Sequence, residues 1–383
     1  MAKKTLAIIG ASYLQLPLVR KAREMGLRTV CCAWADGAVC RNEVDVFYPI
    51  SIVDKEKILS VCQEEGISGI TSIATDVAVP TIAYVAGEMA LVGNTVESAK
   101  KSTNKFLMRE AFRQAGVPSP AFSIVDGIDN LPLVIDGMNF PLVVKPTDRS
   151  GSMGVTRVDD YDALEGAVKQ AIADSFCGKA IVEECITDMH EVSVEGISRA
   201  GDYFPLQITD KVTTGAPHYV ELGHHQPAKL SAEMKKQVID VVQRGVAALD
   251  IEYGASHAEL MITRDGRIFM TEIGARMGGD FIGSDLVQLS TGYDFVRGVI
   301  NVALGQFVPP VLENAGCSGV WFYTRHTPEA LAMIVGTPVP AEVVQRELQS
   351  NETPILTRSA DRSGYFIYKS ERRVEIPVRC DNE

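Results

Sequence analysis

The chain has 383 residues, 46% of them hydrophobic and 22% charged, which is typical of a globular protein with two or three folded domains. Its formal net charge of −12 argues against nucleic acid or an anionic membrane as the main partner. The N-terminal apolar run is broken by Gly10 and Ser12 too early for a signal peptide. No apolar run approaches the ~20 residues that a membrane-spanning helix needs.

The eight cysteines show neither a CxxC pair nor the His/Cys spacing of a metal site. Cys31 and Cys32 are adjacent in a segment that we expect to be a buried strand. We interpret the whole set as reduced thiols and therefore expect a cytoplasmic protein.

The first ~95 residues alternate short apolar runs with helical segments, which predicts a parallel, doubly wound sheet. The expected strands lie at 5–9, 29–33, 44–48 and 69–74, and the expected helices at 14–25 and 55–65. Such sheets bind ligands beyond the carboxyl ends of their strands, so Ser12, Asp36 and Asp76 are candidate specificity residues. The first turn reads GASYLQ rather than GxGxxG, which disfavours a dinucleotide site.

Two longer helices are predicted in the middle of the chain. One spans 103–115, with Ser102 or Thr103 as its N-cap. A loop-rich stretch and the strand PLVVKP follow it. The second helix spans 232–249, with Ser231 as its N-cap and an apolar stripe at helical spacing along one side.

The stretch HAELMITRDGRIFMTEIGAR predicts a β-hairpin, because the Asp-Gly pair at 265–266 suits a two-residue turn with positive φ at both positions. Arg264 then faces Arg267, and Glu259 lies directly opposite Glu272. Opposite residues have Cβ atoms ~4.5–5.5 Å apart, so two carboxylates there repel each other. A shared Mg²⁺ would explain the pair. A carboxylate dyad for acid–base chemistry is a second explanation. The remaining alternatives are two surface glutamates near Arg267 or Arg276, or a longer loop with a shifted register.

Lys145 ends an apolar strand and is followed closely by the glycine-bearing loop SGSMGV. This combination suits a polyphosphate, because the ammonium neutralises charge while loop N–H groups and hydroxyls close over the oxygens. An ordinary hairpin turn with a lysine at its rim is the alternative. The chain has no GxxxxGK[ST] motif, which disfavours a P-loop NTPase.

Other candidate ligand-binding residues lie near these motifs. Arg276 has the same strand parity as Glu272 and could hold a phosphate or carboxylate oxygen beside a metal. His257 would face Gly274 on the same side of the hairpin. The segment IVEECITDMHE leaves an apolar strand through two glutamates and could offer its backbone to an adenine edge, with Glu191 as a ribose acceptor. A strand followed by a solvated turn is the alternative.

Four segments in chain order resemble the ATP-grasp superfamily: NKFLMREAFRQAGVPSP, PLVVKPTDRSGSMGV, IVEECITDMHEVSVEG and AELMIT…IFMTEIGARMGG. The resemblance covers roughly residues 5–310. Two further stretches, TDKVTTGAPHYVELGHHQPA and DRSGYFIY, resemble the carboxylate–amine ligases that include bacterial L-amino acid ligases. The implied architecture is mixed α/β and α+β. Its parts are a Rossmann-like parallel-sheet domain at 1–95, an ATP-grasp domain at 96–308 with a lid subdomain at about 121–188, and a small β-rich domain at 309–383.

The resemblance also implies a role for individual residues. The nucleotide-binding positions are Lys105, Lys145, Ser150, Gly151, Ser152, Gly154, Glu184, Cys185, Ile186 and Glu191. Glu259 and Glu272 would hold the metal, while Arg276 and Lys145 would be catalytic. The substrate-side candidates are His218, Glu221, His224, His257 and Ser12, although the same residues could merely cap turns.

The implied activity is that of an ATP-dependent, ADP-forming carbon–nitrogen ligase that uses Mg²⁺ or Mn²⁺. The partners are ATP and small-molecule carboxylate and amine substrates, with no nucleic acid and no membrane; a homodimer is an open option. The family often has Asn where this chain has Gly274, which puts a second metal in doubt. The alternatives are a bicarbonate-activating carboxylase of the same fold, a non-catalytic MgATP-binding sensor and a nicotinamide oxidoreductase.

Overall fold

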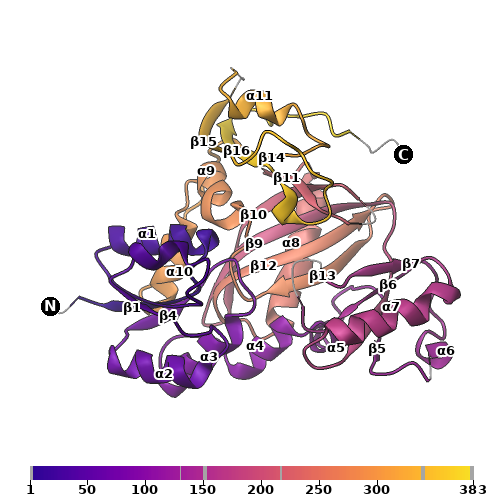
Figure 1. Cartoon of the computed structure of the whole chain (residues 1–383), viewed down its shortest axis with the longest axis horizontal. Coiled ribbons are helices and arrows are strands. Elements are labelled where there is room, and N and C mark those ends of the chain that lie inside the picture. The colour runs from indigo at the N-terminus through magenta and orange to yellow at the C-terminus, as the bar shows by residue number, and fades with distance from the viewer. Residues whose placement is uncertain (1–2, 130, 150–152, 216–217, 338–340, 380–383) are drawn as a thin grey trace.

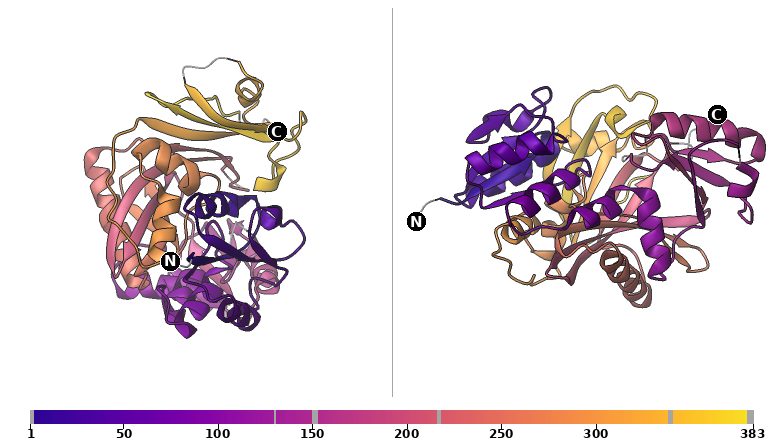
Figure 2. Two further views of the ribbon diagram at one scale, coloured as in Figure 1. Left: turned by 90° about the vertical axis from the view of Figure 1, so that its left-hand side faces the viewer. Right: turned by 90° about the horizontal axis from the view of Figure 1, so that it is seen from below.

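The computed structural model describes residues 3–129, 131–149, 153–215, 218–337 and 341–379. Within these ranges, no helix has the length and apolar character needed to cross a bilayer. Figure 1 shows a central sheet with the N-terminal domain on one side and a smaller α/β unit on the other. The C-terminal strands lie at one end of the central sheet, as the view from the side in Figure 2 also shows.

The predicted parallel sheet of the N-terminal domain is confirmed. Its strands pair in the order β3-β2-β1-β4. They are β1 (Thr5–Ile9), β2 (Arg28–Cys32), β3 (Val46–Tyr48) and β4 (Gly69–Thr71). The accompanying helices are α1 (Leu16–Glu24), α2 (Lys55–Glu64) and α3 (Val79–Glu88). Apolar residues of β1 and β2 have no exposed surface, which explains why these strands are near-continuous apolar runs.

The helix predicted at 103–115 is in fact the second of two helices. They are α4 (Val96–Thr103) and α5 (Lys105–Gln114). Asn104 has extended backbone angles, and its side-chain oxygen accepts from the Leu107 N–H at 3.1 Å. The N-cap of α5 is therefore Asn104 rather than Ser102 or Thr103. Asn104 lies between the two helices, and its side-chain amide caps the start of the second one.

The smaller α/β unit is built on a separate antiparallel sheet in the order β5-β8-β6-β7, within the residues predicted as a lid subdomain, and is called the lid subdomain below. Its strands are β5 (Phe122–Val125), β6 (Leu142–Pro146), β7 (Thr156–Val158) and β8 (Ala180–Glu184). Its helices are α6 (Leu131–Val134) and α7 (Tyr161–Asp174). Helix α7 covers one face of the sheet, and buried Leu164 and Val168 pack in the same core as Leu142 and Val144.

The central sheet has eight strands in the order β13-β12-β9-β10-β11-β14-β16-β15. The strands are β9 (Met189–Arg199), β10 (Asp202–Thr213), β11 (Glu221–Gln226), β12 (Tyr253–Thr263), β13 (Ile268–Gly274), β14 (Cys317–Tyr323), β15 (Glu342–Leu348) and β16 (Gly364–Ser370). Strand β14 pairs with β11, so the predicted C-terminal β-rich part continues the sheet of the middle of the chain. The stretch TDKVTTGAPHYVELGHHQPA, which resembles part of the carboxylate–amine ligases, contains β11.

The remaining helices pack on the central sheet or close its ends. Helix α8 packs against β13, and its predicted N-cap is confirmed by a hydrogen bond of 3.1 Å from the Met234 N–H to Ser231 Oγ. The helices are α8 (Ala232–Ala248), the π-helical turn η3 (Ile282–Leu286), α9 (Val287–Thr291), α10 (Phe295–Ala303) and α11 (Ala330–Ile334).

The turn between β12 and β13 differs from the predicted one. The Thr263 N–H donates to the Arg267 carbonyl at 2.9 Å, so the loop contains three residues rather than two. The predicted pairing of Arg264 with Arg267 is therefore wrong. Gly266 has φ of +85°, the left-handed conformation that a three-residue loop with a glycine bulge needs.

Glu259 nevertheless pairs with Glu272, as predicted. Leu260 pairs with Met270, and the next pair along the ladder skips Thr271. This β-bulge adds one residue to β13 and cancels the shift introduced by the longer turn. The two carboxylates thus come together through two compensating departures from the regular hairpin.

The N-cap of α8 gives a test of the fold. Ser231→Ala should lower the free energy of unfolding by ~1 kcal/mol, because it leaves a first-turn N–H without its acceptor. Urea unfolding followed by circular dichroism measures this change. Ser60→Ala, on the exposed side of α2, is the matched control and should stay within ~0.5 kcal/mol of the wild type. Equal stability of the two variants would contradict the capping role.

Candidate functional site

A cavity of about 450 Å³ lies where the N-terminal domain, the lid subdomain and the central sheet meet. Asp76, just beyond the first sheet, and Ser359, from the C-terminal part, also line it. Most of the predicted site residues are brought together here. They are Lys105, Lys145, Glu184, Cys185, Ile186, Glu191, Glu221, His224, His257, Glu259, Glu272 and Arg276.

Three polar residues predicted from the sequence do not line this cavity. His218 and Asp36 are exposed elsewhere on the surface. The Ser12 hydroxyl donates to Gln15 Oε1 at 2.7 Å and caps the short turn before α1. This local capping is the ordinary structural role of a serine at such a turn, so Ser12 has no contact here that indicates a ligand.

The predicted glycine loop is described only in part. Ser150, Gly151 and Ser152 lie outside the described residues. Gly154 has φ of +71°, and a Cβ at this position would come within 2.9 Å of the Pro146 ring. Glycine is therefore required where the loop returns to the end of β6.

The lysine at the end of β6 belongs to a buried ion-pair group. Lys145 Nζ lies 2.5 Å from Glu183 Oε2, and Arg109 Nε lies 2.7 Å from Glu183 Oε1. Burial lowers the pKa of Lys145, and the attraction of Glu183 only partly offsets it. The sequence analysis missed Glu183 and Arg109; a glutamate on an otherwise apolar strand was the available indication.

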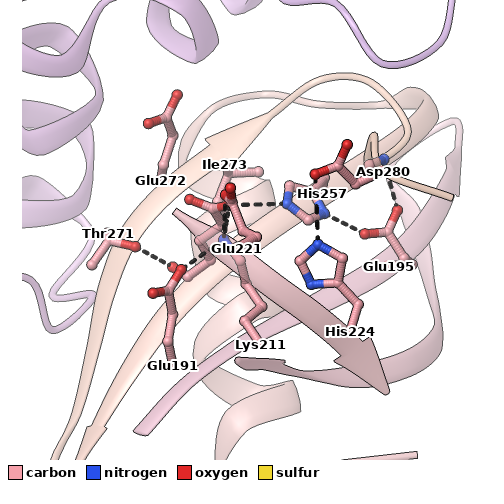
Figure 3. A network of polar contacts seen from close by, with 12 residues as sticks. Glu191, Glu195, Lys211, Glu221, His224, His257, Thr271, Glu272, Ile273 and Asp280 are labelled. Carbon is pink, nitrogen blue, oxygen red and sulfur yellow. Dashed lines mark hydrogen bonds and ion pairs between the residues drawn. The ribbon is translucent and has the colours of Figure 1, made fainter. Parts of the chain in front are cut away.

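Lys211, also missed, lies at the centre of a cluster of carboxylates. Its ammonium is 2.6 Å from Glu191, 2.7 Å from Glu259 and 4.0 Å from Glu221. Figure 3 shows Glu191 and Glu221 close to this ammonium, with Glu272 set apart. Burial disfavours the charge on Lys211, but the three carboxylates raise its pKa well above the usual value. The ammonium therefore stays charged in the cavity.

The two predicted metal ligands are each compensated by a lysine. Glu259 pairs with Lys211, and Glu272 Oε2 lies 3.3 Å from Lys105 Nζ. Among the described residues, no three His, Cys, Asp or Glu side chains form a cluster that could hold a metal by themselves. The pair Glu259 and Glu272 fits Mg²⁺. This ion commonly takes one or two carboxylates together with phosphate oxygens and water, rather than ligands from the protein alone.

His257 connects Glu259 to a second, fully buried carboxylate. Its Nδ1 contacts Glu195 Oε1, and its Nε2 lies 3.2 Å from Glu259 Oε1. Burial opposes a charge on this imidazole, but the two carboxylates raise its pKa to about 9. The ring therefore donates from both nitrogens at neutral pH, so it cannot act as a base there.

Arg276 makes a bidentate pair with Asp76, with two N–O distances of 2.9 Å. This pair joins the loop after β13 to the N-terminal domain. A Cβ at position 274 would lie 2.7 Å from Asp76 Oδ1 and 3.2 Å from the Arg276 guanidinium. The glycine at the position where the resembling family often has Asn is thus explained, because a side chain at 274 would displace the Asp76–Arg276 pair.

A second bidentate pair joins Asp280 to Arg362 from the C-terminal part, with N–O distances of 2.7 and 2.9 Å. Asp280 and Phe281 both have positive φ, which is unusual for residues with a side chain. His224 is buried, and its Nε2 lies 3.8 Å from Asp280 Oδ2. Among the described residues, neither ring nitrogen of His224 has a hydrogen-bond partner, and both nitrogens are buried.

The predicted adenine-binding segment is a short connection at the end of β8. The Glu184 carboxylate accepts from the N–H and the side-chain amide of Asn139, at 2.9 and 3.1 Å. The Cys185 N–H donates to the Pro141 carbonyl at 2.9 Å. These bonds fix the segment against the loop before β6, while Glu184, Cys185 and Ile186 still line the cavity.

Residues 138–285 match the family model of the ATP-grasp domain. Alanine–anticapsin ligase of Bacillus subtilis is 26% identical over 245 residues, which are 58% of this chain and 51% of that protein. D-alanine–D-alanine ligase of Lactococcus lactis is 24% identical over 201 residues, 50% of this chain and 56% of that protein. The chain thus spans about half the length of these relatives.

Solved structures match almost the whole chain in fold. L-amino acid ligase from Bacillus licheniformis superposes with a TM-score of 0.79 at 23% identity, covering 97% of this chain and 94% of that one. The ADP complex of N5-carboxyaminoimidazole ribonucleotide synthetase gives a TM-score of 0.78 at 18% identity, with 97% and 94% coverage. This chain therefore contains an ATP-grasp domain, set within the overall fold of the ATP-grasp ligases.

Proposed function

We propose that this protein is an ADP-forming carboxylate–amine ligase that makes an amide through an acyl-phosphate intermediate. The observation that carries the proposal is one cavity in which three lysines, two opposed glutamates and Arg276 converge. The similarity to alanine–anticapsin ligase and D-alanine–D-alanine ligase supports the same reaction class. The free thiols found among the described cysteines support a cytoplasmic location, which is part of the proposal.

The first step joins the substrate carboxylate to the γ-phosphorus of ATP. A carboxylate oxygen forms the new O–P bond while the bond to the β-phosphate oxygen breaks, and ADP leaves. Lys105, Lys145 and Lys211 would neutralise the charge that develops on the phosphoryl oxygens. Magnesium on Glu259 and Glu272 would supply further charge neutralisation.

The second step forms the amide. The amine nitrogen attacks the acyl carbon, the bond from carbon to the phosphate oxygen breaks, and the nitrogen loses a proton. Arg276, which projects into the cavity from the loop after β13, would hold the acyl or carboxylate oxygen during this exchange. The cavity must exclude water, because water would otherwise hydrolyse the acyl phosphate. Its position between the lid subdomain and the central sheet suits that requirement.

The cavity lining includes Asp76, Arg276 and Asp280, and Asp280 is paired with Arg362 behind it. The Asp76–Arg276 pair offers an acceptor beside a planar set of donors, which complements a small molecule carrying both an ammonium and a carboxylate. Glu221, which accepts from Ser359 at 3.1 Å, adds a negative charge to the lining. The proposed substrates are therefore small, polar carboxylates and amines.

Phosphate release from MgATP tests the activity. A panel of carboxylates and amines, singly and in pairs, should release phosphate only with particular pairs. Glu272→Ala should reduce this release by at least ~100-fold, because it removes charge stabilisation at the transferring group. Glu56→Ala, on the exposed side of α2, is the control and should behave as the wild type.

The same experiment separates the proposal from its rivals. Turnover with bicarbonate in place of an organic carboxylate would assign a carboxylase of this fold. Tight ATP binding without turnover on any pair would assign a nucleotide sensor and contradict the ligase.

The Asp280–Arg362 pair gives a pH prediction. Burial raises the pKa of Asp280, but the Arg362 guanidinium overrides it, so the net pKa is below the ordinary value. A lowered pKa means that the ionised carboxylate stabilises the fold above the ordinary aspartate range and that this stability is lost on acidification. The stability difference between wild type and Asp280→Asn should therefore shrink by on the order of 1 kcal/mol from pH 6 to pH 3.

Thermal unfolding of both proteins across this pH range measures the difference. Asp126→Asn, at an exposed site, is the matched control, and its difference from the wild type should stay nearly constant. A pH-independent difference for Asp280→Asn would show that the ion pair does not control this stability.

A further inference from the structure

Glu195 lies in the middle of β9 with no exposed surface. It faces His257 on the neighbouring strand, and His257 in turn faces Gly274 on β13. A carboxylate buried inside a sheet is costly unless its oxygens are paired and hydrogen-bonded. The proposed reaction gives Glu195 no direct role, so its position requires another explanation.

Both oxygens of Glu195 are used, and each reaches a different part of the site. Oε1 contacts His257 Nδ1, while Oε2 accepts from the Gly278 N–H at 3.0 Å. The other ring nitrogen of His257 lies 3.2 Å from Glu259 Oε1. A continuous polar chain therefore runs from the backbone at Gly278 through Glu195 and His257 to the Glu259 carboxylate, as Figure 3 shows for the labelled members.

The loop that Glu195 holds carries other residues of the cavity. Arg276 is two positions before Gly278, and Asp280 is two positions after it. A Cβ at position 278 would lie 2.7 Å from both Glu195 Oε1 and His257 Nδ1. The loop backbone thus packs directly on the Glu195–His257 pair, and only glycine allows this approach.

We propose that Glu195 is a positioning residue that fixes the Glu259 carboxylate relative to the loop bearing Arg276 and Asp280. It acts through His257 on one side and the Gly278 N–H on the other. The inference rests on the proposed function in one respect, the assignment of Glu259 to the metal. When a residue that hydrogen-bonds to a metal ligand and orients it is altered, the metal affinity typically changes 10–100-fold.

Metal binding without turnover tests this role. Mn²⁺ is titrated into the protein with ADP and followed by electron paramagnetic resonance, and ADP binding is measured separately in EDTA. Glu195→Gln should weaken Mn²⁺ binding by ~10-fold or more, while metal-free ADP binding stays within about 2-fold of the wild type, because no ADP contact is assigned to Glu195. A general structural defect would weaken both.

Two further variants complete the test. Ser198→Ala, buried in the same strand and paired with Gly254 away from Glu259, controls for a change inside β9. His257→Asn keeps a short polar side chain beside Glu195 but removes the link to Glu259. It should reproduce the loss of Mn²⁺ affinity even if Glu195→Gln does not fold.

The outcomes separate the two proposals. Wild-type Mn²⁺ affinity in Glu195→Gln or in His257→Asn would overturn the positioning role, as would a wild-type protein that binds no Mn²⁺ with ADP. Weakened Mn²⁺ binding in these variants, combined with a wild type that turns over no substrate pair, would support the positioning role while the ligase proposal fails.

Discussion

Charge compensation between distant segments holds the cavity together. Burying an ionised side chain is unfavourable unless an opposite charge lies against it, so each buried carboxylate here requires a cation from elsewhere in the chain. Asp76 meets Arg276 across 200 positions, and Asp280 meets Arg362 across 82. Glu259 meets Lys211 from two strands away in the sheet. The N-terminal domain, the central sheet and the C-terminal part are thereby locked around the same space, and the charges that fix the fold are those that a polyanion and its metal would engage.

Local patterns were sufficient to predict the elements whose residues interact with near neighbours. The apolar runs predicted the parallel sheet, and Ser231 predicted the start of α8. The family resemblance predicted the overall architecture. The pairing of Glu259 with Glu272 was predicted from a turn that the chain does not form. The two glutamates still pair because the bulge at Thr271 restores the register. A bulge of this kind cannot be recognised from an alternating apolar pattern in the sequence. The roles of the individual site residues remain predictions.

The parts that the sequence analysis missed depend on contacts across long separations. Lys211, Glu183 and Glu195 lie within strands, and only the sheet order shows which partners they face. The absence of Asn at position 274 looked like a weakened metal site. The structure shows that glycine at this position leaves room for a bidentate pair that no motif predicts. Conversely, Ser12 and His218 have residue types that suit a ligand, but neither lines the cavity.

The continuity of β11 with β14 constrains how this protein can open. Strands β14–β16 share a hydrogen-bonded ladder with the strands that carry Lys211 and Glu259, whereas β5–β8 form a sheet of their own. Rigid-body hinge motion is easiest where no ladder has to break, so we expect the lid subdomain to swing while the Arg362 side stays still. In the proposed ligase, nucleotide exchange would then depend on the moving lid subdomain, and the amine would bind on the stationary side of the cavity. Substrate selectivity and the rate of ADP release of that ligase would accordingly be separable by mutation.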